Sequence, residues 1–116
     1  MNDKGSPFFE TSSLQTAFPK SAVKQLIRSS RRLRGRRPLG HAKLEGHIAR
    51  RDPTFQSLVA SQRVAEQIIE DVLTHPVRIV VGRKTVDIYN AVGQGVRFER
   101  ESKEFQTFLE ASRASR

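Results

Sequence analysis

The hydrophobic period of the chain changes at His75-Pro76, and this change constrains the fold more than any other feature. Before it, apolar residues recur three and four positions apart, which is typical of an amphipathic helix. After it, apolar and polar residues alternate, which is typical of strands with one buried face. Helices followed by consecutive strands predict an α+β domain, in which helices cover one face of an antiparallel sheet.

The segment before this change predicts a long core helix over about residues 54–74. Asp52 is a good N-cap for it, Pro53 suits the first helical position, and His75-Pro76 ends it. We expect the apolar face of this helix to form the main core. Its predicted members are Phe55, Leu58, Val59, Ala65, Ile68, Ile69, Val72 and Leu73.

Four short alternating segments follow, at about residues 77–81, 85–89, 96–99 and 104–110. Glycine-containing or polar turns separate them, and such short links favour an antiparallel meander. The apolar face of this sheet is expected to pack on the core helix. The outer face is then predicted to show Arg78, Thr85, Asp87, Tyr89, Arg97 and alternate residues of the last strand.

Two shorter helices are predicted ahead of the core helix. The first begins at Phe18-Pro19 and ends near Gly35, and the second covers about residues 41–51. Leu44 and Ile48 define the apolar stripe of the second helix.

The length of 116 residues is enough for one domain. We interpret residues 1–17, which are polar and aperiodic, as a loose leader. Residues 18–116 are predicted to form a single domain, with a basic helix and linker at 18–40 and a core at 41–110. Only 36% of the residues are hydrophobic, so a few well-patterned segments must supply the core.

The positive charge is concentrated in one segment. The formal net charge is +9, and residues 20–51 hold eleven Lys or Arg against one acid, Glu45. Six arginines lie between Arg28 and Arg37, more than helix capping requires. This asymmetry indicates an anionic partner such as nucleic acid, an anionic membrane surface or an acidic protein. A solvated basic linker is the alternative interpretation. No apolar run approaches the roughly 20 residues that span a bilayer.

Several chemistries are excluded or disfavoured. The chain has no Cys, so it forms no disulfide, zinc-thiolate site or thiol nucleophile. The three His are scattered, and HExxH, P-loop, GxGxxG and GxSxG motifs are absent. We therefore expect neither a metal nor a cofactor. RNA cleavage by the substrate's own 2′-hydroxyl remains possible, because it needs only an acid or base and cations.

His47 is the best acid–base candidate, because an imidazole titrates near neutrality and this one lies at the edge of an apolar stripe. Arg97, on the outer sheet face, is the best phosphate clamp, with Thr107 and Tyr89 as supports. Each also has an ordinary interpretation: a helix-edge packing histidine, a solvated arginine, and regular strand residues. The further residues predicted to contact RNA are Lys43, Arg50, Arg51, Lys84, Arg78, Arg31, Arg32, Arg34, Arg36 and Arg37.

Three stretches carry a resemblance to known proteins: LEGHIARRDPTF, VDIYNAVGQGVRFER and EFQTFLE. With the order of helices and strands, they resemble the barnase/EndoU/colicin/RelE group of ribonucleases. They are more closely similar to the C-terminal toxin domains of contact-dependent inhibition and other polymorphic toxin systems. The resemblance covers roughly residues 41–110.

The resemblance implies a small metal-independent ribonuclease that acts on tRNA. It would be secreted or displayed by the producer, act in the cytoplasm of a neighbouring bacterium, and be neutralised by an acidic immunity protein. His47 takes the role of the helix histidine, and Arg97 and Thr107 take the sheet roles. Relatives often have a second histidine shortly after the first, where this chain has Arg50-Arg51; His41 could supply the second imidazole instead.

Two other functions stay open on the sequence. The chain could be a non-catalytic nucleic-acid-binding module that uses its arginine run, or a protein-interaction domain whose basic segment binds an acidic partner.

Overall fold

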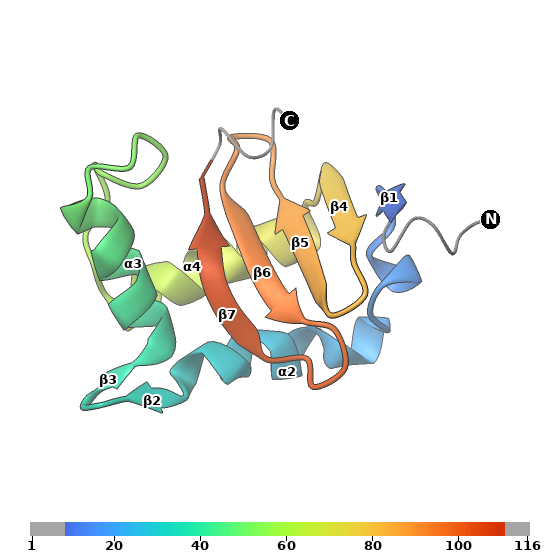
Figure 1. Cartoon of the computed structure of the whole chain (residues 1–116), viewed down its shortest axis with the longest axis horizontal. Coiled ribbons are helices and arrows are strands. Elements are labelled where there is room, and N and C mark those ends of the chain that lie inside the picture. The colour runs from blue at the N-terminus through green and yellow to red at the C-terminus, as the bar shows by residue number, and fades with distance from the viewer. Residues whose placement is uncertain (1–8, 111–116) are drawn as a thin grey trace.

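The predicted change of period marks the junction of helix and sheet in the computed structural model, which describes residues 9–110. Helix α4 (Gln62–Thr74) passes behind the sheet in Figure 1, and His75 follows it as the C-cap. The α+β class is confirmed, and the four predicted strands form an antiparallel meander. They are β4 (Arg78–Val81), β5 (Thr85–Tyr89), β6 (Gly95–Glu99) and β7 (Phe105–Leu109).

The sheet of the described residues has five strands rather than four. Strand β1 (Phe9–Thr11) pairs antiparallel with β4 and gives the order β1-β4-β5-β6-β7. A 3₁₀ turn follows at Leu14–Thr16, and its Leu14 is buried. Residues 9–17 therefore belong to the folded body, and their interpretation as a loose leader was wrong. A three-residue edge strand is too short to produce a periodic signal. Residues 1–8 of the predicted leader lie outside the described part.

The first predicted helix ends earlier than expected. Helix α2 (Val23–Arg28) is flanked by 3₁₀ turns at Lys20–Ala22 and Ser29–Arg31. The hydroxyl of Ser29 donates back to the carbonyl of Leu26 at 2.6 Å, and such side-chain bonding competes with helix continuation.

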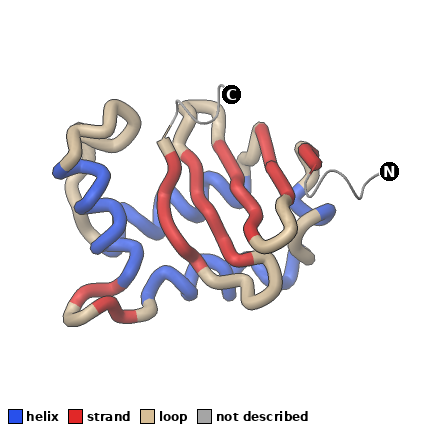
Figure 2. Tube along the Cα trace, viewed as in Figure 1, coloured by secondary structure: helices blue, strands red, loops and turns tan. Residues whose placement is uncertain are grey.

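A small hairpin then occupies the stretch that was predicted to be the end of this helix. Its strands are β2 (Leu33–Arg34) and β3 (Arg37–Pro38). Gly35, at its tip, has a φ of 67°, which glycine adopts without steric cost. Helix α3 (Leu39–Ala49) starts directly after Pro38, two residues before the predicted boundary, and lies beside the edge strand β7 (Figure 2).

The core helix is shorter than predicted. It begins at Gln62, where the hydroxyl of Ser61 caps the backbone N–H of Val64 at 3.0 Å. Residues 52–60 form turns instead of helix, visible as the loop that joins α3 to α4 in Figure 2. Phe55 is still fully buried, but Val59 is 73% exposed, so its predicted place on the core face was wrong. The helical spacing of the apolar residues here is coincidental.

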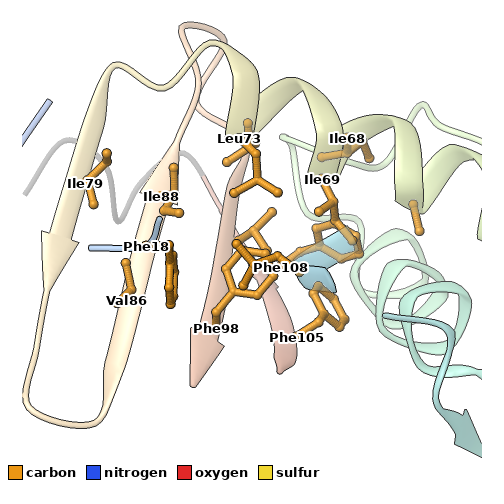
Figure 3. Close-up of a cluster of buried hydrophobic side chains, with 14 of the residues drawn as sticks. Phe18, Ile68, Ile69, Leu73, Ile79, Val86, Ile88, Phe98, Phe105 and Phe108 are labelled. Atoms are coloured by element: carbon orange, nitrogen blue, oxygen red, sulfur yellow. The ribbon is translucent and has the colours of Figure 1, made fainter. Parts of the chain in front are cut away.

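The core lies between α4 and the inner face of the sheet (Figure 3). Helix α4 buries the predicted face from Ala65 to Leu73. From the sheet side, alternate residues of the strands point inward, as expected for a half-buried sheet. The largest of them are Ile79, Ile88, Phe98, Phe105 and Phe108, all at most 1% exposed.

Tyr89 lies on the outer face but is only 3% exposed, so it is not the solvent-facing side chain that was predicted. It is opposite Gly95, and its ring lies against that residue. A Cβ at Gly95 would come within 2.5 Å of Cε2 of Tyr89 and 2.9 Å of Cβ of Leu109. The glycine therefore makes room for the tyrosine ring.

Gly95→Ala is expected to lower the free energy of unfolding by about 1–3 kcal/mol, because the added methyl group must displace the Tyr89 ring or the backbone. Urea denaturation measures this change. Gly46→Ala is the matched control: its Cβ would contact only Nη1 of Arg50, at 3.4 Å. Within helix α3 this change should stabilise by about 0.5–1 kcal/mol. Equal effects of the two substitutions would contradict the packing described.

Candidate active site

His47 and Asp52 form a buried pair at the end of helix α3. Nδ1 of His47 is 2.7 Å from Oδ2 of Asp52, and the two residues are 7% and 6% exposed. An ionised carboxylate only accepts hydrogen bonds, so Nδ1 carries the proton and donates it. This fixes the tautomer and leaves the lone pair of Nε2 for another partner.

The helix C-terminus brings this pair together. The backbone N–H of Asp52 donates to the carbonyl of His47 at 3.1 Å, and that of Arg51 donates to Ile48 at 3.0 Å. Arg51 has a φ of 57°. These features define a Schellman motif, in which a left-handed residue turns the chain back across the last helical turn. The carboxyl group of Asp52 therefore returns to the side chain of His47.

Two phenylalanines hold the imidazole ring. The ring centroid of His47 is 5.1 Å from that of Phe55 and 6.4 Å from that of Phe108, the latter in an edge-to-face arrangement. The two phenyl rings also contact each other, at 5.5 Å. Phe55 comes from the loop after α3 and Phe108 from β7, so the position of the histidine depends on both. His47 was predicted to lie at the border of the apolar stripe, and its side chain is more buried than that position implies.

His47 lines a cavity of about 370 Å³ between helix α3, the β2–β3 hairpin and strand β7. Lys43, His47 and Arg50 are spaced i, i+4 and i+7, which places them on one face of α3. Arg34 comes from the hairpin and Thr107 from β7. The complete lining is Arg34, Ala42, Lys43, Gly46, His47, Arg50 and Thr107.

The cavity is electropositive. Within residues 9–110, no carboxylate forms an ion pair with Arg34, Lys43 or Arg50. Partial burial lowers the pKa of the Lys43 ammonium, and the charges of Arg34 and Arg50 lower it further. Like charges held together with no carboxylate partner among residues 9–110 are a suitable environment for an anionic group such as a phosphate.

Arg97 is close to this cavity in the sheet but is already paired. It lies directly opposite Thr107 on the neighbouring strand. Its guanidinium makes two hydrogen bonds of 2.8 Å to the carboxylate of Asp87, and these bonds raise the pKa of Arg97. The bidentate carboxylate offsets the charge of Arg97 and occupies the Nε–Nη2 edge of its guanidinium, one of the edges that could bind a phosphate. Arg34, Lys43 and Arg50 are therefore better placed to bind a phosphate than Arg97.

The two remaining predicted catalytic residues lie outside the cavity lining. His41 is in the first turn of α3, where its backbone N–H donates to Oε1 of Gln62 at 2.9 Å. Tyr89 lies on the outer sheet face, with the guanidinium of Arg78 5.8 Å from its ring centroid. Arg78 also bonds to Glu10 at 2.8 Å.

The predicted RNA-contacting residues separate into groups. Lys43, Arg50 and Arg34 line the cavity with His47. Arg36 and Arg51 are exposed outside it. Lys84 lines a different cavity, which also contains Glu99 and Glu101. Four others are paired with acids, in the ion pairs Arg31–Glu66, Arg32–Glu104, Arg37–Glu45 and Arg78–Glu10.

Asp52 is the site residue that the sequence analysis assigned to another role. It was predicted to cap the core helix, and it does accept the N–H of Thr54 through Oδ1 at 2.9 Å. Its other oxygen holds His47. The sequence signal that could have revealed this pair is a His in the last helical turn followed, five residues later, by an Asp beyond the helix end.

Among residues 9–110, no group of three or more His, Cys, Asp or Glu side chains is arranged to hold a metal ion. No helix in this part of the chain has the length and apolar character needed to cross a membrane. A search of protein-family models, of curated proteins and of solved structures found no match to this chain.

Proposed function

We propose that this protein is a metal-independent RNA endonuclease, with His47 as the general base and Arg34, Lys43 and Arg50 around the scissile phosphate. The observation that carries the proposal is the cavity, which combines an oriented histidine with three cations that have no carboxylate partner among the described residues. A base beside a phosphate site is the minimum that 2′-hydroxyl attack requires.

In this mechanism Nε2 of His47 removes the proton of the 2′-hydroxyl as its oxygen attacks the adjacent phosphorus. Asp52 accepts from Nδ1 and stabilises the imidazolium that forms. Arg34 and Arg50 offset the negative charge that builds up on the phosphoryl oxygens, and the hydroxyl of Thr107 donates a hydrogen bond to the same group. The product ends are a 2′,3′-cyclic phosphate and a 5′-hydroxyl.

The biological part of the proposal rests on the resemblance of residues 41–110 to C-terminal toxin domains. The substrate is then tRNA, and the domain acts in the cytoplasm of a neighbouring bacterium after delivery from its producer. An acidic immunity protein would neutralise the basic surface in the producer.

Purified protein is expected to cleave tRNA in total RNA equally well with and without excess chelator, because the cavity supplies its own acid–base and cationic groups. Gel analysis measures cleavage, and end-labelling identifies the 2′,3′-cyclic phosphate. A DNA oligonucleotide of the same sequence is the control, since it lacks the attacking hydroxyl. Intact tRNA at high protein concentration, or cleavage that chelator abolishes, would contradict this proposal.

The main alternative is a non-catalytic module that binds nucleic acid through its basic surface. The exposed Arg34 and Arg36 of the β2–β3 hairpin favour it. Such a module would bind RNA and DNA with similar affinity, weaken steeply with salt, and leave both intact. A protein-interaction domain would bind neither at physiological salt. The cleavage assay and a binding titration on the same preparation separate the three functions.

A further inference from the structure

Cleavage needs a second proton transfer, because the leaving 5′-oxygen must be protonated. The other predicted imidazole, His41, does not line the cavity. Lys43 does, one helical turn before His47, and side chains with this spacing have Cβ atoms about 5–6 Å apart. Both side chains can therefore reach the same phosphate.

The chemistry of the three cations distinguishes Lys43 from the others. The guanidinium groups of Arg34 and Arg50 keep their protons in proteins, so they act only as charges and hydrogen-bond donors. An ammonium can release a proton. The cavity thus contains two groups that can exchange protons with the substrate, the imidazole of His47 and the ammonium of Lys43.

We propose that Lys43 is the general acid of this site and protonates the 5′-oxygen as His47 deprotonates the 2′-hydroxyl. This inference rests on the proposed ribonuclease activity. In the balanced step, the 2′-oxygen forms a bond to phosphorus and the bond from phosphorus to the 5′-oxygen breaks. One proton passes from the 2′-hydroxyl to Nε2 of His47, and one passes from Nζ of Lys43 to the 5′-oxygen. Exchange with water restores both residues.

The surroundings of Lys43 favour this role. The charged or titratable groups that line the cavity with it are Arg34 from β2 and His47 and Arg50 from its own helix, whereas β7 contributes only the hydroxyl of Thr107. Burial and the two guanidinium groups lower the pKa of Lys43. Its ammonium is therefore a stronger acid than that of a solvent-exposed lysine.

A leaving-group substitution tests the proposal. A short RNA that spans a mapped cleavage site is prepared with the ordinary 5′-oxygen and with sulfur at that bridging position, because a thiolate leaves without being protonated. Lys43→Gln is expected to lower the cleavage rate constant about a hundredfold on the oxygen substrate and much less on the sulfur substrate, where only the charge of Lys43 is lost. His47→Gln should slow both. Lys24→Gln, an exposed lysine of α2, is the matched control and should slow neither.

Lys43→Arg keeps the charge but cannot release a proton, so it should lose activity on the oxygen substrate as Lys43→Gln does.

The pH dependence of the wild type provides a second test. Its rate should fall at high pH as Lys43 loses its proton, and this fall should begin at a lower pH than an ordinary lysine would give. This fall of the rate at high pH should be absent on the sulfur substrate. Equal losses on both substrates, or full activity of folded Lys43→Arg, would overturn the acid role while leaving the nuclease proposal in place. A wild-type protein that cleaves neither substrate would overturn both.

Discussion

Replacement of His47 by glutamine is expected to lower the rate constant for RNA cleavage by about 10²–10⁴-fold, the range usual for loss of a general acid or base. Glutamine has nearly the length of histidine and keeps a polar amide, although its nitrogen takes the place of Nε2 and not of the Nδ1 that bonds to Asp52. It offers no basic nitrogen to the 2′-hydroxyl. The loss should therefore lie in the rate constant at saturating RNA and leave the affinity for RNA largely unchanged.

The matched control is His75→Gln, because His75 caps α4 at an exposed position and lies outside the cavity. Its activity should equal that of the wild type. Circular dichroism and thermal unfolding confirm that both variants are folded. If folded His47→Gln retained wild-type cleavage, the histidine would be a packing residue, and the base would have to be sought elsewhere.

Phe55→Ala is expected to destabilise the protein by about 3–5 kcal/mol, the usual cost of deleting a fully buried phenyl ring. Phe55 is 0% exposed although it lies in a loop, and it contacts the rings of both His47 and Phe108. The substitution removes the support of the imidazole as well as core volume. Activity per folded molecule should therefore also fall, at temperatures where the variant remains folded.

Guanidinium denaturation measures the change in free energy of unfolding, and cleavage assays well below the transition measure the activity of the folded form. Val59→Ala is the control in the same loop, because this side chain is largely exposed. It should change stability by no more than about 0.5 kcal/mol. Similar losses for the two variants would mean that the loop contributes to stability in some way other than through the Phe55 anchor.

The parts of the fold that the sequence predicted are those in which one residue pattern had a single explanation. The strict alternation after Pro76 predicted the four-stranded meander, since no helix can bury alternate residues on one face. The prediction that the core helix begins before Ser61 was wrong, because the spacing of Phe55, Leu58 and Val59 fits a helix by chance. Asp52-Pro53 matched a helix start, but only turns follow: Asp52 accepts the N–H of Thr54 and also bonds to His47 of the preceding helix.

In the candidate site too, the sequence predicted what one residue pattern determines and missed what depends on other elements. The sequence selected His47 because its helical position can be read from spacing alone. The pairing of Arg97 with Asp87 depends on the register of β5 against β6, which alternation does not specify. The place of Arg34 in the cavity depends on a hairpin whose strands have two residues each. The sequence analysis placed His47 and Thr107 in one site, and both line the cavity, but contacts that depend on strand register or on such short strands were not predicted.

The Schellman motif at the end of α3 also determines how the site is assembled. His47 and Asp52 are five residues apart, so the hydrogen bond between them is local to one helix terminus. Thr107 and Phe108, in contrast, belong to the last strand of the sheet. In a chain that emerges from the N-terminus onward, the imidazole and the carboxylate are therefore both present before the strand that packs on the imidazole and lines the cavity. The proposed activity would then require β7 to dock beside α3, because this strand completes the cavity.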